Sequence, residues 1–453
     1  MAKLVHPRTV TRREALKTGA GAVAATGAVL YAPAVIGQAR PLDGVTLNVS
    51  CWSAPYPQWL AEYLPEFEDL TGAKINYDTP GFPVYNQRVD LELSTQGSAY
   101  DVVNVTFIYS SRWIGAGWFE PLQPYLEDPE KTPPDWQPTD FLPCAVGPLK
   151  GADGVIYGVP WIIADAYMAA AGRFDLLEQA GLGMPDTFDD IVTMCQAVND
   201  QDGVKAFVNE NHHGWTWIPY LHGFGGDVFV DPPDNLMPSL DTPEAIAAAE
   251  YYARLLKEFG PDGVLSYTYD QSLNTLKQGR ANYTTFNQAW LVQLGDAETS
   301  KVASTVNYSM MPRGPAGRFP GVASHGWGIP VGSQNKDAAW EFIKWAMSKE
   351  LMERMLIEKG YGSQTRLSII DSAAFKEKMT VNGHDVAKLY VDTIDLASAG
   401  HMAYRTVHVY PQVDKQIDKA IENIVSGQMS AKEALQQAQA NSIADLRRGG
   451  IKL

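Results

Sequence analysis

The pattern of apolar and polar positions alternates between strand-like and helix-like segments. Apolar residues alternate or run together over 45–49, 74–77 and 100–105, whereas 59–70 has the three-to-four-residue spacing of an amphipathic helix. Strands that alternate with helices are typical of an α/β protein with largely parallel sheets. The pattern therefore predicts an α/β fold whose first strand begins near residue 45.

Helix start signals continue this pattern beyond residue 180. Thr187 is followed three residues later by Asp190, and Ser430 is followed at the same distance by Glu433. A hydroxyl side chain with an acidic residue three positions on can cap the first turn of a helix. Together with the segment 241–244, which places a proline after a threonine, these signals predict three helices beginning near residues 187, 242 and 430.

Residues 1–39 have the composition of an export signal. The pair Arg12 and Arg13 precedes a weakly apolar stretch, 18–30, and small residues follow. Paired arginines at this place indicate the twin-arginine route and a periplasmic protein. A retained membrane anchor is the alternative, but the stretch is rich in glycine and alanine and Pro33 interrupts it.

The charge of the chain argues against anionic partners. The sequence has 36 Lys and Arg against 52 Asp and Glu, and its net charge is −16 at pH 7. Since the predicted signal is basic, the mature chain is more acidic still. Such a surface repels phosphate backbones and anionic lipid, so we expect no nucleic-acid binding.

The sequence predicts no cofactor, metal site or catalytic centre. Cys51, Cys144 and Cys195 lack metal-binding spacing and allow at most one disulfide. The adjacent His212 and His213 are poorly placed to bind one ion together, and the common hydrolase and phosphate-binding motifs do not occur. An exported carbohydrate-active enzyme remains an alternative, because a glycosidase needs only two carboxylates on separate loops.

Short motifs recur in order over nearly the whole chain after residue 40. They are 67–72, 100–103, 117–122, 157–161, 176–188, 278–282, 325–330, 335–343 and 410–411. In this order they resemble the extracellular solute-binding proteins of ABC importers, of the family 1 type that includes maltose- and other sugar-binding proteins. Asn282 departs from the pattern, because the family usually has an apolar residue there, and Tyr283 would supply the missing bulk.

The resemblance implies a type II periplasmic-binding-protein fold with two discontinuous lobes. Lobe one would comprise 40–157 and 331–362, and lobe two 158–330 and 363–453. Hinge crossings would lie near Gly158–Trp161, Gly321–Pro330 and Gly360–Thr365. The protein would be a monomer that binds a sugar, sugar alcohol or oligosaccharide between its lobes and delivers it to the membrane permease subunits of an importer.

The loops expected at the cleft are rich in aromatic and polar side chains. Indole rings cover the apolar face of a sugar, and planar polar groups bond its hydroxyls. The candidate ligand-binding residues are Trp52, Ser53, Tyr109, Trp113, Trp161, Asp165, Trp215, Trp217, Asn287, Trp290, His325, Trp327 and Arg366.

Each candidate also has a structural alternative. Any of the tryptophans could pack in a core, Asp165 could cap a helix, and Arg366 could steady a hinge. The resemblance favours Trp290 and Trp327, where the family often places cleft residues. A polyamine is the alternative ligand, but it would need several carboxylates and these loops offer mainly Asp165.

Overall fold

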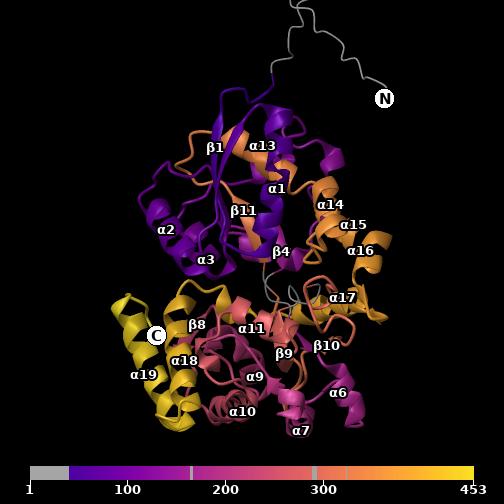
Figure 1. Cartoon of the computed structure of the whole chain (residues 1–453). Coiled ribbons are helices and arrows are strands. Elements are labelled where there is room, and N and C mark those ends of the chain that lie inside the picture. Colours follow the sequence, from indigo (N-terminus) through magenta and orange to yellow (C-terminus); the bar gives the residue numbers. More distant parts are fainter. Residues whose placement is uncertain (1–39, 164–166, 288–292, 323) are drawn as a thin grey trace, which may run out of the picture. The chain divides into compact units, whose positions relative to one another are not determined.

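Two mixed β-sheets organise the part of the chain that the computed structural model describes, residues 40–163, 167–287, 293–322 and 324–453 (Figure 1). The first sheet has the order β2 (Lys74–Asp78), β1 (Thr46–Ser50), β3 (Val102–Val105), β11 (Ser324–Gly328) and β4 (Val159–Ile163). The second has the order β10 (Asn307–Met310), β5 (Tyr167–Ala171), β9 (Ala281–Asn287) and β6 (Lys205–Phe207).

The sheets are less parallel than the sequence pattern predicts. β1 runs parallel to β2 and β3, and β6 runs parallel to β9. β11 is antiparallel to β3 and β4, and β5 is antiparallel to β9 and β10. The prediction of largely parallel sheets was therefore wrong, because an apolar run shows that a strand exists but carries no information on its direction.

Helices from distant parts of the sequence cover the two faces of the first sheet. One face packs against α1 (Pro55–Thr71), α13 (Lys336–Ala346) and α14 (Lys349–Lys359), and the other against α2 (Phe82–Ser94) and α3 (Phe107–Gly115). Figure 1 shows α13 and α14 in orange among the indigo elements of the first hundred residues. On β3, Val102 and Val103 enter opposite cores, as the two-residue period of a strand requires.

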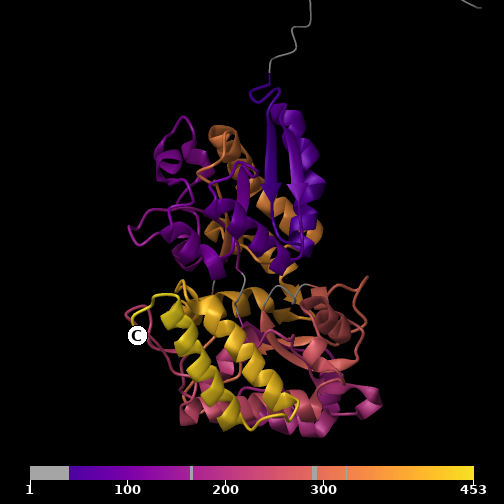
Figure 2. The ribbon, with the colours of Figure 1, turned by 90° about the vertical axis from the view of Figure 1, so that its left-hand side faces the viewer.

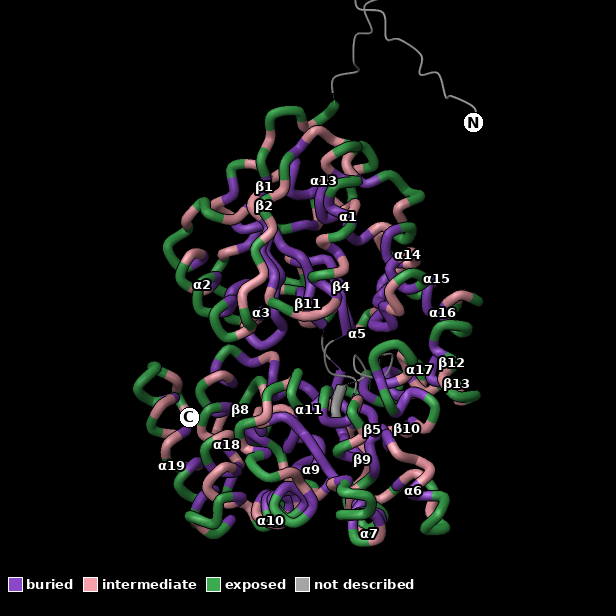
Figure 3. The backbone as a smooth tube through the Cα atoms, viewed as in Figure 1, coloured by how far each residue is buried: buried purple, intermediate pink, exposed green. Residues whose placement is uncertain are grey.

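The second sheet lies in the largest core, which extends to the C-terminus. Its longer helices are α7 (Phe188–Val198), α10 (Pro243–Phe259), α11 (Tyr269–Lys277), α17 (Val386–Ala397), α18 (Tyr410–Val425) and α19 (Ala431–Arg448). The last two are side by side in both views of the ribbon (Figures 1 and 2). Figure 3 shows burial along the chain, and every described residue of β4 and β5 is buried.

Shorter elements fill the connections. They are α4 (Gln123–Glu127), η1 (Pro134–Trp136), α5 (Pro143–Val146), η2 (Gly147–Leu149), α6 (Phe174–Gln179), η3 (Gln201–Gly203), α8 (His213–Thr216), α9 (Ile218–Gly223), η4 (Val264–Ser266), α15 (Leu367–Ile370), α16 (Ala373–Lys378), η5 (Ala403–Arg405) and the hairpins β7 (Phe229–Asp231) with β8 (Asn235–Pro238) and β12 (Thr380–Val381) with β13 (His384–Asp385). No helix among the described residues combines the length and the hydropathy that crossing a bilayer requires.

The predicted helix starts are confirmed. The Thr187 hydroxyl accepts a hydrogen bond from the Asp190 amide at 3.1 Å, and the Asp190 carboxylate accepts one from the Thr187 amide at 2.9 Å. Ser430 and Glu433 form the same reciprocal box before α19, and Thr242 caps α10. Each cap satisfies amides that have no partner within their own helix.

The chain passes between the sheets where β4 gives way to β5, and again between β10 and β11. The predicted lobe boundaries place β4 and β11 in lobe two, whereas both strands pair within the first sheet. The segment after α14 is bonded to β4, since the Ser363 hydroxyl donates to the Ile163 carbonyl at 2.8 Å and the Thr365 hydroxyl to the Pro160 carbonyl at 3.0 Å. The predicted crossings near Gly158–Trp161 and Gly360–Thr365 are thus joined by hydrogen bonds.

Candidate functional site

Four aromatic side chains gather at one end of the first sheet. Trp52 follows β1, while Phe82 and Phe107 open the helices that follow β2 and β3. His325 lies in β11, and its ring centroid is 5.1 Å from that of Trp52 and 5.0 Å from that of Phe107. The carboxyl ends of parallel strands meet at one edge of a sheet, which is where α/β proteins collect ligands.

A β-bulge lies where β4 pairs with β11. His325 pairs with Ile162 and Gly326 with Pro160, so Trp161 is the extra residue on β4. The His325 ring contacts Trp52 and Phe107, whereas Trp327 stacks on Trp161 inside the core with ring centroids 4.8 Å apart. Burial, and then the charge of Arg405, lowers the pKa of His325 to about 3, so its ring is neutral at physiological pH.

Side chains that follow the second sheet complete the cluster. The ring of Trp215, in α8, lies 6.0 Å from Phe82 and 5.9 Å from Phe107. The guanidinium of Arg405 packs against two of these rings, with its Cζ 4.6 Å from the centroid of Phe107 and 4.3 Å from that of Trp215. Arg405 Nη1 also donates to the Tyr167 hydroxyl at 3.2 Å. We call these seven residues the aromatic cluster: Trp52, Phe82, Phe107, Tyr167, Trp215, His325 and Arg405.

The cluster combines apolar ring faces with buried polar atoms. Within the described part of the chain, Trp215 Nε1 and His325 Nδ1 are buried and have no hydrogen-bond partner. Buried polar groups in native proteins are normally paired with protein, water or ligand. The arrangement therefore suits a small ligand that has both C–H surface and hydroxyl groups.

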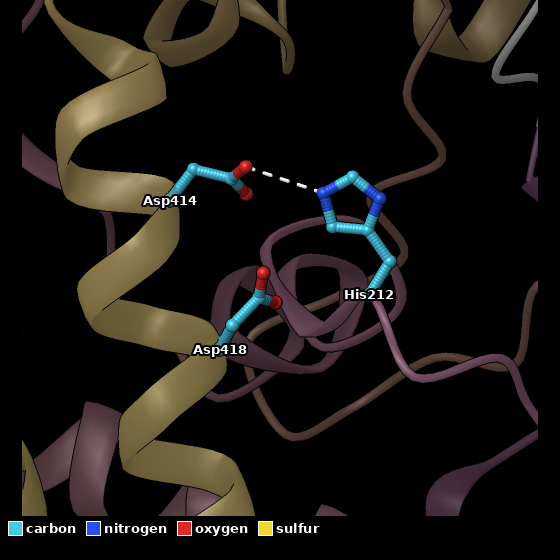
Figure 4. Close-up of side chains that lie close together, drawn as sticks. All are labelled: His212, Asp414 and Asp418. Carbon is cyan, nitrogen blue, oxygen red and sulfur yellow. Dashed lines mark hydrogen bonds and ion pairs between the residues drawn. The ribbon is translucent and has the colours of Figure 1, made fainter. Parts of the chain in front are cut away.

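An acidic pair on α18 lies beside His212, the residue that stacks on Trp215. Figure 4 shows Asp414 and Asp418 one turn apart, with the His212 ring facing Asp414. His212 Nε2 lies 3.2 Å from Asp414 Oδ2, and the His212 ring stacks on Trp215 with centroids 4.5 Å apart. Burial alone would lower the pKa of His212, but the charge of Asp414 and its hydrogen bond raise that pKa to about 9. His212 is therefore an imidazolium at neutral pH.

The imidazole and the two carboxylates could each bind a metal ion, and their ligand atoms lie within 4.8 Å of one another. Among the described residues this set has three members, whereas a closed tetrahedral zinc site has four protein ligands. Asp418 already accepts bonds from the His213 and Gly214 amides, at 2.6 and 3.1 Å. An ion pair backed by these bonds accounts for the arrangement.

The chain matches the model of one protein family over most of its length. Residues 53–353 match the bacterial extracellular solute-binding proteins. The chain belongs to this family. As a solute-binding protein it is 23% identical to the erythritol/L-threitol-binding protein of Mycolicibacterium smegmatis over 74% of this chain and 73% of that protein. It is 24% identical to the mannitol-binding protein of Pseudomonas aeruginosa, over 81% and 85% of the two chains.

Solved structures support the fold class. An ABC transporter solute-binding protein of Agrobacterium radiobacter, in complex with ribitol, matches with a TM-score of 0.80 at 22% identity, over 89% of this chain and 99% of the other. The predicted type II periplasmic-binding-protein fold is confirmed.

The structure brings only some of the predicted site residues together. Trp52, Trp215 and His325 belong to the aromatic cluster. Ser53 lies next to it in sequence, but its amide donates to the Pro80 carbonyl at 2.7 Å and its side chain is exposed. Tyr109 stacks on Trp113, with ring centroids 5.3 Å apart. Asp165, Trp290 and the side chain of Asn287 lie outside the described residues.

The structure places five predicted ligand-binding residues in cores instead. Trp113, Trp161, Trp217 and Trp327 are fully buried among apolar side chains, so we assign them to packing. Arg366 is also fully buried, against the rings of Trp136 and Phe141, and its Nε donates to the Met347 carbonyl at 2.9 Å. Burial lowers the pKa of Arg366 to about 10. These contacts correspond to the structural alternative considered for Arg366.

The candidate residues from the sequence did not include Phe82, Phe107, Tyr167 and Arg405. Phe82 follows a strand and a Pro-Gly pair, so the rule that selected Trp52 would also have found it. Arg405 carries no comparable signal, because no motif surrounds it and arginine is among the residues least expected in a buried position.

Proposed function

We propose that this solute-binding protein binds an acyclic sugar alcohol at the aromatic cluster and delivers it to the permease of an ABC importer. The observation that carries the proposal is the Arg405 guanidinium packed against the rings of both Phe107 and Trp215. It offers hydrogen-bond donors beside apolar ring faces, and a polyol has hydroxyl groups along a flexible C–H chain. The polyol names of the two relatives and the ribitol in the similar structure support the same ligand class.

A polyamine fits the cluster less well. Arg405 would repel an ammonium group, and the nearby Asp414 carboxylate is already paired with His212. A polyamine needs free carboxylates to pair with its charges. We therefore propose a neutral ligand.

A ligand panel tests the proposed class. We expect ribitol, D-mannitol or erythritol to raise the unfolding temperature of the mature protein and to give a saturable calorimetric signal, because a ligand that binds only the folded state stabilises it. Putrescine should leave both readings unchanged, because Arg405 would repel its ammonium groups. Stabilisation by putrescine alone would replace the polyol with a polyamine.

We propose that transport is achieved by closure of two lobes without catalysis, in a monomer. The lobes are organised around the two sheets, with the strands β4 and β11 in lobe one. Phe82 and Phe107 on one side and Trp215 and Arg405 on the other would contact the ligand together. A ligand that touches both lobes favours the closed form by its difference in affinity for the two states.

We propose that export follows the twin-arginine route, with residues 1–39 as the signal. Changing Arg12 and Arg13 to Lys should leave the precursor in the cytoplasm, since the pair acts as an address read by a receptor. Cell fractionation followed by immunoblotting measures the distribution. The variant purified from the cytoplasm should bind its ligand like the wild type, and normal periplasmic delivery of the variant would exclude this route.

A further inference from the structure

One face of α18 holds a short segment that ends at Trp215. Asp414, Asp418 and Glu422 follow one another at four-residue spacing, so their side chains lie on the same face of the helix. Glu422 Oε1 accepts from Asn211 Nδ2 at 3.0 Å, Asp418 accepts from two amides of the segment, and Asp414 pairs with His212. Each of residues 211–214 is thus bonded to one of these three carboxylates.

The fit between this segment and α18 is close. A Cβ atom built on Gly214 would lie 1.5 Å from Asp414 Oδ1, so the backbone can approach the carboxylate only at a glycine. The Tyr410 hydroxyl, also on α18, donates to the Gly214 carbonyl. The Tyr167 hydroxyl, from β5, donates to the Trp215 carbonyl at 3.0 Å. Hydroxyl groups from two different elements therefore hold the backbone at Gly214 and Trp215.

We call the bonds that hold residues 211–215 to α18 and Tyr167 the clamp. The His212 ring extends the clamp to the side chain of Trp215. It lies nearly parallel to Trp215, at an interplanar angle of 25°, and Arg405 lies over a face of the same indole. A cation over an indole face is attracted by the ring quadrupole. Rotation of the indole would break its stacking with His212 and uncover Arg405.

We propose that His212 is a positioning residue of the ligand site: held by Asp414, its ring fixes the plane of Trp215 and so sets the affinity for ligand. The proposal rests on the proposed polyol function. The arrangement is costly, because two carboxylates one turn apart on a helix repel each other. Burial, and then the charge of Asp414, raises the pKa of Asp418 to about 6. Costly charge arrangements of this kind are concentrated at functional sites.

The charges around His212 predict the sign of a pH effect. Its pKa of about 9 in the folded protein lies above the ordinary value of 6.5, so the ion pair with Asp414 is complete at neutral pH and is lost as the pH rises through about 9. Asp418 and Glu210 act on His212 in the same sense as Asp414. Burial lowers the pKa of His213 to about 3 and raises that of Tyr109 on α3, so both stay neutral at pH 7, and Arg405 stays charged.

Calorimetry with ribitol and D-mannitol between pH 7 and pH 10 tests the proposal. We expect His212→Gln and Asp414→Asn to bind about tenfold more weakly than the wild type at pH 7, as for the loss of one charged hydrogen bond. The wild-type affinity should fall above pH 9 toward that of His212→Gln, whose own affinity should change little over this range. Matched controls are His384→Gln in β13 and Asp392→Asn, which pairs with Lys388 on α17; both should bind like the wild type.

Amide hydrogen exchange of residues 211–217 without ligand provides a second measurement. Faster exchange in His212→Gln and Asp414→Asn, but not in the controls, supports the clamp. Wild-type affinity and an unchanged pH profile in both variants would overturn the proposal. If the wild type binds neither polyol, the proposed function fails. In that case faster exchange in the two variants still supports the positioning of Trp215 by His212, and unchanged exchange overturns it.

Discussion

Replacing Trp327 by Ala should lower the free energy of unfolding by about 3–5 kcal/mol, which is typical of a large aromatic residue removed from a core. Trp327 is fully buried, stacks on Trp161 and contacts the edge of Phe342, with ring centroids 6.0 Å apart. The surrounding β4, β11 and α13 are joined by backbone pairing and helix packing, so they cannot collapse fully into the space left by the indole. Urea unfolding without ligand measures the change.

The same variant separates a core role from a ligand-binding role. If Trp327 only packs, the folded fraction of Trp327→Ala should bind polyol within about threefold of the wild type, since mutations distant from a site act on stability alone. The matched control is Trp118→Ala, a half-buried tryptophan of the same sheet region, which should cost about 1 kcal/mol. Unchanged stability combined with lost affinity would return Trp327 to the ligand site.

Much of the fold could be predicted from local sequence patterns. The capping residues Thr187, Thr242 and Ser430 each begin a helix in the structure. These predictions succeed because a cap is a contact between neighbouring residues. Strand direction was not predictable in this way, since the partners of β11 are more than 150 residues away in the sequence.

The candidate site also depends on contacts between residues that are distant in the sequence. His325 and Trp327 are two residues apart on one strand and would share a face in a regular strand. Their rings contact different side chains, since His325 lies against Trp52 and Trp327 against Trp161. The bulge beside them lies in β4, where Trp161 is the extra residue, and the glycine inside β11 is a local hint of it. A Cβ atom at Gly326 would lie 2.5 Å from the Val159 carbonyl oxygen, so the close approach of β4 requires this glycine. Nothing local joins His212 to Asp414, which is 202 residues away.

Replacing Trp215 by Ala should weaken polyol binding by about 2 kcal/mol, or roughly thirtyfold, because central aromatic residues dominate binding energies. Trp215 contacts Phe82 and Phe107 across the cluster and covers Arg405. Its loss would remove ring surface from the ligand and expose the guanidinium to water, where its bonds to hydroxyl groups are weaker. Calorimetry on the folded variant, checked by circular dichroism, measures the effect.

A control variant at a second tryptophan shows whether the loss of affinity comes from the ligand site or from a general loss of stability. Trp345, in α13, is half-buried like Trp215, but it packs against Phe67 and Phe342 and has no contact with the aromatic cluster among the described residues. Trp345→Ala should therefore keep the wild-type affinity even if it unfolds more easily. Trp215→Phe should recover part of the affinity, because a phenyl ring still covers one face of Arg405. If Trp215→Ala binds ribitol and D-mannitol as tightly as the wild type, the ligand contacts other residues, and the proposed place of the site is wrong even though the family assignment stands.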